Sequence, residues 1–211
     1  MSGVVYIVDD DDAVRDSLDV LLRMRGYRTR PYATGAAFLD AVETDVPGCI
    51  ILDLRMPAPD GLEVLKHLRG RGIDLPIVVL TAHGDAGSAR AAFKGGAFEF
   101  LEKPLDDAAL VAAIEAATRA GTAAYALRQR RAELQRRLAR LTAREHEVLL
   151  HVLAGRHNRE IAAVLDISPR TVEVYKTKLL DKLQVDRLPA LIRVALEAGL
   201  TDDTGAHKGN P

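Results

Sequence analysis

Short strand-like segments alternate with amphipathic helical segments in the first part of the chain, and this alternation limits the fold more than any other feature. Five such segments begin at residues 3, 28, 48, 75 and 98, and a helical pattern follows each one. Strands that are apolar on both sides are typical of a parallel sheet covered by helices on both faces. The pattern therefore predicts an α/β unit built from βα repeats.

The remainder of the chain has only helical patterns. Thr142 and Glu145 form a capping box at the start of one segment, and Ser168 followed by Pro169 is a typical start for another. We expect four short helices here. Two of them, separated by a turn around Ile167, are predicted to form a helix-turn-helix.

The two halves differ in charge. Residues 1–121 have 13 lysines and arginines against 19 acidic residues, a net charge of -6, whereas residues 122–211 have 16 against 11, a net charge of +5. A basic half is the one suited to bind a polyanion. We therefore divide the 211-residue chain into an α/β domain, a helical linker, a helical domain and a disordered tail, at residues 1–121, 122–140, 141–200 and 201–211.

The linker leaves two interpretations open. Leu127, Leu134 and Leu138 fall on a heptad pattern, but Arg131 interrupts it. The segment is either a short dimerising helix or a solvated helical linker.

We expect a soluble, cytoplasmic protein without a membrane partner. No apolar run approaches the roughly 20 residues that cross a bilayer. The chain starts without the pattern of a secretory signal, and its single cysteine, Cys49, cannot form an internal disulfide.

Polar residues stand where the predicted strands end. Asp9 and Asp10 follow the first strand, Asp53 ends the third, Thr81 ends the fourth and Lys103 ends the fifth. In an open parallel sheet the functional crevice lies beyond these carboxyl ends. We therefore expect the carboxylates to crowd there and to need a cation.

The chemistry of these residues indicates phosphoryl transfer. Carboxylates without histidine or cysteine favour Mg²⁺ over zinc. Asp53 would be the nucleophile that becomes an aspartyl phosphate, and Lys103 would neutralise the phosphoryl oxygens together with the metal. Thr81 could donate a hydrogen bond to the modified side chain.

Four motifs, "VDD", "DLRMPAPDG", "LTA" and "EKP", resemble the receiver domain of bacterial two-component response regulators over about residues 3–121. The resemblance implies a five-stranded parallel sheet in the order 2-1-3-4-5. It also implies that Asp53 is the phosphoacceptor and that Asp9, Asp10, Asp53 and the backbone carbonyl of Arg55 bind Mg²⁺.

The same resemblance assigns the switch residues. Lys103 matches the phosphoryl-binding lysine, and Pro104 matches a cis-proline. Thr81 matches the hydroxyl that follows the phosphate, and Phe100 takes the place of the aromatic switch residue.

A helical wheel of residues 169–183 predicts which side chains face outward. Val172, Leu179 and Leu183 share one face, which should be buried. Glu173 lies between the two faces and could accept a hydrogen bond from cytosine, and an outward valine could contact a thymine methyl group. The predicted DNA-binding set is Arg170, Thr171, Glu173, Val174, Lys176, Thr177 and Lys178.

Residues 141–200 resemble the LuxR-type helix-turn-helix, so the whole chain is similar to a NarL/FixJ-type response regulator. This resemblance implies a transcriptional regulator that a sensor histidine kinase phosphorylates on Asp53. It also implies that phosphorylation favours a homodimer, which binds double-stranded DNA.

Two other functions are compatible with parts of the pattern. An aspartate-nucleophile phosphatase generally needs an acid two residues after the nucleophile, where this chain has Arg55. We therefore expect no enzyme activity beyond slow autodephosphorylation. The other function is a constitutive DNA-binding or scaffold protein whose receiver is never phosphorylated.

In the run Asp9 to Asp12, we expect Asp12 to cap the first helix and Asp11 to be a solvated neighbour.

Overall fold

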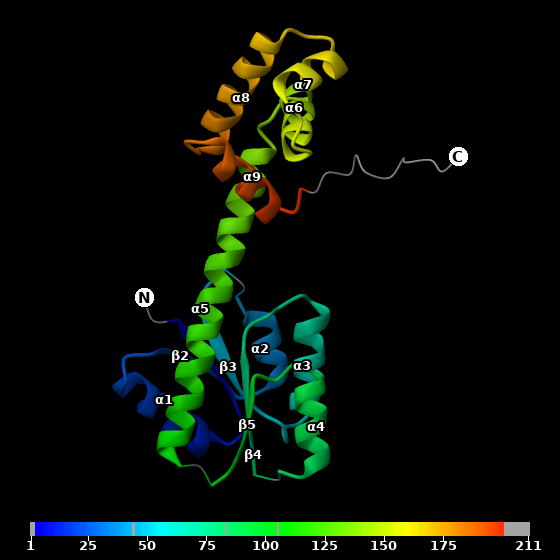
Figure 1. Cartoon of the computed structure of the whole chain (residues 1–211). Coiled ribbons are helices and arrows are strands. Elements are labelled where there is room, and N and C mark those ends of the chain that lie inside the picture. The colour runs from blue at the N-terminus through cyan, green and yellow to red at the C-terminus, as the bar shows by residue number, and fades with distance from the viewer. Residues whose placement is uncertain (1–2, 44, 83, 105, 201–211) are drawn as a thin grey trace, which may run out of the picture. The chain divides into compact units, whose positions relative to one another are not determined.

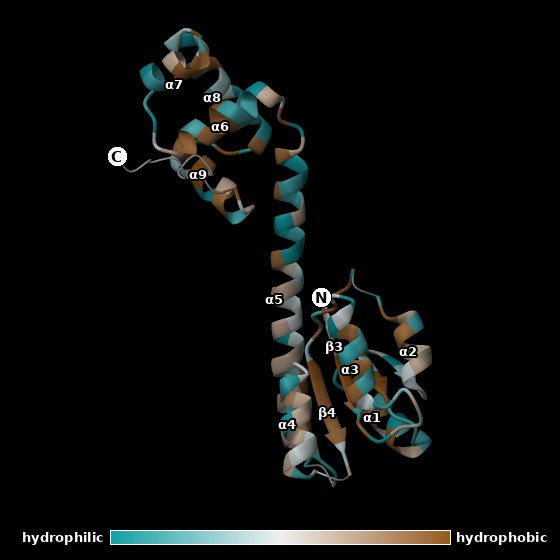
Figure 2. Ribbon diagram, turned by 90° about the vertical axis from the view of Figure 1, so that its right-hand side faces the viewer, coloured by the Kyte–Doolittle hydropathy of each residue, from teal (hydrophilic) through white to brown (hydrophobic). Residues whose placement is uncertain are grey.

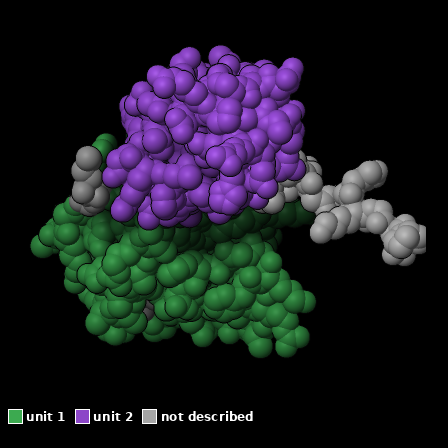
Figure 3. Space-filling view, turned by 45° about the horizontal axis from the view of Figure 1, so that its top comes forward, with its two compact units in different colours: residues 1–126 green, residues 127–211 purple. Residues whose placement is uncertain are grey.

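The computed structural model describes residues 3–43, 45–82, 84–104 and 106–200. The chain divides into two compact units, residues 1–126 and 127–211 (Figure 3). The tail predicted to be disordered, residues 201–211, lies outside the described residues.

Unit 1 is an α/β sandwich in which strands and helices alternate (Figure 1). The five strands form one parallel sheet in the order β2-β1-β3-β4-β5, which confirms the predicted fold. The strands are β1 (Val4–Val8), β2 (Arg28–Tyr32), β3 (Gly48–Asp53), β4 (Ile77–Thr81) and β5 (Glu99–Glu102). The helices are α1 (Asp12–Met24), α2 (Gly35–Ala41), α3 (Gly61–Gly70), α4 (Ala86–Lys94) and α5 (Asp107–Leu138), of which α5 continues beyond residue 126 into unit 2.

Side chains of the central strands pack alternately on the two faces of the sheet, because successive strand residues point to opposite sides. Tyr6 and Leu52 belong to the core cluster that packs against α2, α3 and α4. Ile7 and Ile51 belong to the cluster that packs against α1 and α5. Both faces are therefore apolar, and β3 and β4 are brown over most of their length in Figure 2.

Helix α5 is long and includes most of the predicted linker. Gly121 lies inside it and does not end it. A Cβ atom at Gly121 would lie 2.0 Å from the carbonyl oxygen of Gly48 at the start of β3. Only glycine lets the helix and the strand approach so closely.

Unit 2 contains the four predicted helices around their own core. Thr142 caps the first of them with the expected capping box to Glu145, and Ser168 caps the third, with Pro169 at its first turn. Asp166 lies between the second and third helices in the left-handed region, with φ of 52°. The helices are α6 (Ala143–Leu153), α7 (Asn158–Leu165), α8 (Pro169–Leu183) and α9 (Leu188–Glu197).

Within the described parts of the chain, no helix combines the length and apolar character that would let it span a membrane.

We expect the substitution Gly121→Ala to lower the free energy of unfolding of unit 1. The clash with Gly48 should cost about 2 kcal/mol, more than the roughly 1 kcal/mol that alanine gains in helix propensity. Urea denaturation of the full chain, followed by circular dichroism, measures the change. Gly70→Ala is the matched control, because a Cβ atom there meets nothing within 4 Å. An equal response of the two variants would contradict the close-approach argument.

Candidate functional site

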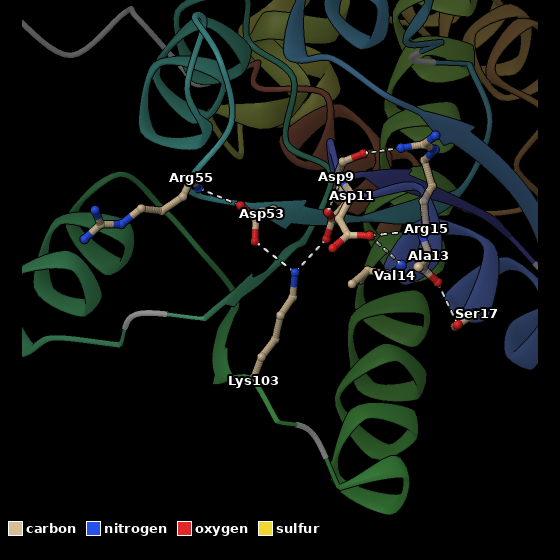
Figure 4. A network of polar contacts seen from close by, with 9 residues as sticks. All are labelled: Asp9, Asp11, Ala13, Val14, Arg15, Ser17, Asp53, Arg55 and Lys103. Carbon is tan, nitrogen blue, oxygen red and sulfur yellow. Dashed lines mark hydrogen bonds and ion pairs between the residues drawn. The ribbon is translucent and has the colours of Figure 1, made fainter.

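Three side chains from three different strands meet at the carboxyl end of the sheet. The ammonium group of Lys103, which follows β5, donates hydrogen bonds to Asp9 Oδ2 at 2.7 Å and to Asp53 Oδ1 at 3.0 Å. Figure 4 shows Lys103 reaching between the two carboxylates. The sheet order places β1 beside β3, so the structure brings these three predicted residues together.

Both carboxylates are almost fully buried, with exposed fractions of 2% for Asp9 and 5% for Asp53. Burial alone would lower the pKa of Lys103, but its hydrogen bonds to Asp9 and Asp53 outweigh this effect. The pKa of Lys103 is therefore raised above its ordinary value. At neutral pH one ammonium ion is shared by two buried carboxylates.

The loop after β3 holds Asp53 in place. The backbone N–H of Arg55 donates to Asp53 Oδ2 at 2.6 Å. Gly61, the first residue of α3, packs so closely that its missing Cβ atom would lie 2.3 Å from the carbonyl oxygen of Asp53. The glycine of the "DLRMPAPDG" motif thus allows α3 to begin directly against the site.

Thr81 and Phe100 lie on the adjoining strands. Thr81 is fully buried at the end of β4, and its carbonyl accepts a hydrogen bond from the N–H of Lys103 at 2.7 Å. Phe100 on β5 is half-buried, and its ring lies 6.5 Å from that of Phe93 on α4. The bond between Lys103 and Pro104 is cis, as the resemblance implied.

The acidic run divides differently from the prediction. Asp11, not Asp12, caps α1, and its carboxylate accepts hydrogen bonds from the N–H groups of Ala13 and Val14. The prediction that Asp12 is the cap was wrong by one residue, because Asp12 already lies in the first turn and pairs with Arg15.

Arg15 is a site residue that the sequence analysis missed. Its guanidinium donates to the carbonyl oxygen of Asp9 at 2.7 Å. The available signal was a cation one helical turn after a run of four aspartates.

The residues of the site fit a hard cation in their chemistry. Asp9 and Asp53 offer buried carboxylate oxygens, and Mg²⁺ is commonly held by one or two carboxylates together with water. Asp10 is exposed. Among the residues that the structure describes, no three histidine, cysteine or acidic side chains form a ready-made metal cluster. The Mg²⁺ site with Asp10 and the Arg55 carbonyl therefore stays a prediction.

In unit 2, helix α8 has the two faces that the helical wheel predicts. Val172, Leu179 and Leu183 are fully buried. The exposed side includes Val174, an apolar side chain with 49% of its surface in solvent. The other exposed residues of the predicted DNA-binding set are Arg170, Glu173, Thr177 and Lys178.

The remaining two residues of that set are partly buried and have partners inside the unit. Thr171 shares a hydrogen bond of 2.8 Å with the hydroxyl of Ser168. Lys176 donates to Asn158 Oδ1 of α7 at 2.6 Å, and burial lowers its pKa although the charge of Glu173 opposes that shift. The first contact lies within the N-terminal turn of α8, and the second attaches α7 to one flank of α8.

Two family comparisons match separate parts of the chain. Residues 5–115 match the family described as "Response regulator receiver domain". Residues 139–195 match "Bacterial regulatory proteins, luxR family". The first match lies in unit 1 and the second in unit 2.

Similar proteins share both parts. The chain is 46% identical to the transcriptional regulatory protein FixJ of Azorhizobium caulinodans over 198 residues, which is 93% of each chain. It is 41% identical to FixJ of Bradyrhizobium diazoefficiens, over 95% of this chain and 98% of that protein. The chain belongs to the response-regulator family. Among solved structures, this response regulator is similar to StyR, with a TM-score of 0.85, 34% identity and coverage of 93% of this chain and 100% of StyR.

This response regulator is therefore a two-component transcriptional regulator with a receiver domain and a LuxR-type DNA-binding domain. The helix-turn-helix that the LuxR-type family implies corresponds to α7, the turn at Asp166 and α8.

The shared ammonium ion predicts a pH effect on stability. Lys103→Met should lower the free energy of unfolding by about 3 kcal/mol at neutral pH, because two buried carboxylates lose their cation. The pKa of Lys103 is raised in the folded protein, so its stabilising effect is complete below the unfolded pKa and is lost as pH rises through the folded pKa. The difference between the wild type and Lys103→Met should therefore be constant below about pH 10, near the ordinary pKa of lysine, and should shrink as the pH rises above it.

Urea denaturation across this pH range measures the difference. Lys94→Met, which changes an exposed lysine on α4, is the matched control and should show little difference from the wild type at any pH. If the Lys103→Met difference stays constant with pH, the ion pair does not supply the stabilisation.

Proposed function

We propose that a sensor histidine kinase transfers a phosphoryl group to Asp53. The observation that carries this proposal is the Lys103 ammonium ion, which lies 3.0 Å from Asp53 Oδ1. In the transfer, an oxygen of Asp53 bonds to phosphorus while the bond from phosphorus to the kinase imidazole nitrogen breaks. Lys103 is placed to offset the negative charge that the phosphoryl oxygens bring.

We propose that Mg²⁺ is held by Asp9, Asp10, Asp53 and the backbone carbonyl of Arg55. When bound, the ion would reduce the charge on the phosphoryl oxygens. The chain's own residues prepare the site without it: Lys103 donates hydrogen bonds to both Asp9 and Asp53, and the N–H of Arg55 orients Asp53. Slow autodephosphorylation is the only catalysis that we expect.

Thr81 and Phe100 would carry the signal from the site to the surface. The backbone carbonyl of Thr81 accepts a hydrogen bond from the N–H of Lys103. Thr81 ends β4, which pairs with β5, the strand that contains Phe100. We propose that the Thr81 hydroxyl moves toward the phosphoryl group and that Phe100 follows. The bistable element is then the surface formed by α4 and β5.

Phosphorylation would favour a homodimer through this surface. Phe93 on α4 has 51% of its surface exposed, and Phe98 before β5 has 42% exposed. Exposed aromatic rings that lie near a half-buried Phe100 are suited to a contact that changes with the switch. The dimer would bring two copies of α8 to paired half-sites on DNA.

In DNA binding, α8 would enter the major groove. Arg170 and Lys178 are exposed cations that can reach phosphates or guanine, and exposed Val174 can contact a thymine methyl group. Thr171 and Lys176 would act from the edge of this face.

Cytoplasm as the place of action stays a prediction from the sequence.

Asp53→Asn should abolish phosphorylation. With acetyl phosphate or a histidine kinase and Mg²⁺, we expect the wild type to give a shifted band on a phosphate-affinity gel and Asp53→Asn to give none. Asp40→Asn, an exposed aspartate on α2, is the control and should shift like the wild type. A wild type without a shifted band would favour a scaffold that is never phosphorylated. Repeated turnover of phosphate esters without a kinase would favour an enzyme.

Lys178→Ala should weaken DNA binding and reduce its dependence on salt. If Lys178 contacts one phosphate, the slope of log affinity against log salt should fall by about one. Fluorescence anisotropy with labelled duplex DNA at several salt concentrations measures both effects. Lys66→Ala, which changes an exposed lysine on α3 of unit 1, is the control. Equal slopes for the wild type and Lys178→Ala would remove Lys178 from the interface.

A further inference from the structure

Every polar group of Asp9 has a partner in the structure. Its N–H donates to the carbonyl oxygen of Tyr32 at 3.2 Å. Its Oδ1 accepts from the N–H of Asp11 at 3.0 Å, and its Oδ2 accepts from Lys103 at 2.7 Å. Its carbonyl oxygen accepts from Arg15 at 2.7 Å. Asp9 is thus held from four sides at a position that is 2% exposed.

The contact from Arg15 differs from the other three. The two backbone N–H contacts belong to the strand and the loop, and the Lys103 ammonium lies at the proposed phosphoryl site itself. Arg15 reaches Asp9 from α1, from a different side than Lys103 (Figure 4). Its side chain is only 13% exposed, so the contact is sheltered from water.

Arg15 also joins two parts of the acidic run. One guanidinium nitrogen donates to the carbonyl oxygen of Asp9, and the other pairs with the carboxylate of Asp12. A planar guanidinium can make both contacts at once, whereas a lysine ammonium is a single point charge on a flexible chain. Arg15 therefore fixes the end of β1 relative to the first turn of α1.

The charge and the contacts of Arg15 have opposite effects on a cation at the site. A positive charge near Asp9 repels a divalent cation, so removing the charge alone should strengthen binding. Removing the contact leaves a buried carbonyl oxygen without its partner and lets Asp9 move, which should weaken binding. The sign of the change after substitution shows which effect dominates.

We propose that Arg15 is a positioning residue for the phosphoacceptor site: by holding the backbone of Asp9, it orients the Asp9 carboxylate for Mg²⁺. This inference rests on the proposed role of Asp9 in holding the ion. The polar contacts of Arg15 go to Asp9 and Asp12. Its effect on phosphorylation passes through Asp9.

Isothermal titration of MgCl₂ into the full-length protein, without any phosphodonor, tests the proposal. Arg15→Met should weaken Mg²⁺ binding by about tenfold, the lower end of the loss seen when an outer partner of a metal ligand is removed. Arg15→Lys keeps the charge but not the paired contacts, and it should weaken binding by a smaller factor. Urea denaturation of each variant gives its stability and confirms that it is folded at the titration temperature.

Arg23→Met is the matched control on the same helix. Arg23 pairs with Asp19 and Thr29, away from Asp9, and its side chain is 60% exposed. We expect this variant to bind Mg²⁺ like the wild type.

Three results would overturn the inference. Tighter binding by Arg15→Met with unchanged binding by Arg15→Lys would show that only the charge matters. Lower stability with unchanged Mg²⁺ affinity in both Arg15 variants would show a purely structural role. In both of these cases the proposed function would stand, because the wild type binds the ion. Absence of Mg²⁺ binding by the wild type would instead overturn the proposed metal dependence, and this inference with it.

Discussion

Two buried carboxylates that share one ammonium ion are the interaction on which the receiver unit depends. Asp9 and Asp53 are only 2% and 5% exposed, and buried carboxylates need a cation to compensate them. Lys103, which lies 94 residues after Asp9 in the sequence, supplies that cation. The site can therefore form only when β1, β3 and β5 take their observed places in the sheet.

The same interaction gives the site its suitability as a switch. A phosphoryl group on Asp53 would add negative charge where one cation already serves two anions. The contacts around Asp53 would then change. The two strands nearest Lys103 are β4, which ends at Thr81, and β5, which contains Phe100. Arg15 acts on the opposite side of Asp9, where it holds the backbone while Lys103 holds the carboxylate.

Unit 2 solves a related problem with a different residue pair. Glu145 is 3% exposed, and it accepts a hydrogen bond from Lys182 at 2.6 Å as well as capping α6. One carboxylate thus anchors the start of α6 to the last turn of α8. The anchor lies at the end of α8 opposite to Arg170, which is exposed.

Much of this protein could be predicted from the order of its residues. Strand ends follow directly from apolar runs, and parallel strands put their carboxyl ends at one edge, so Asp9, Asp53 and Lys103 were expected to meet. The buried face of α8 was predicted because helical periodicity alone sets which side chains share a side. The capping box at the start of α6 was also a local pattern, with Thr142 and Glu145 three residues apart.

What only the tertiary structure decided depends on side-chain direction and on close approach between distant segments. The N-cap of α1 is Asp11 and not Asp12, because the cap is decided by which carboxylate turns back to the first N–H groups. The contact of Arg15 with Asp9, the contact of Lys176 with Asn158 and the approach of Gly121 to Gly48 involve no sequence periodicity. The sequence by itself determined which residues stand at strand ends and on helix faces, since these follow from backbone periodicity; packing decided which of them touch.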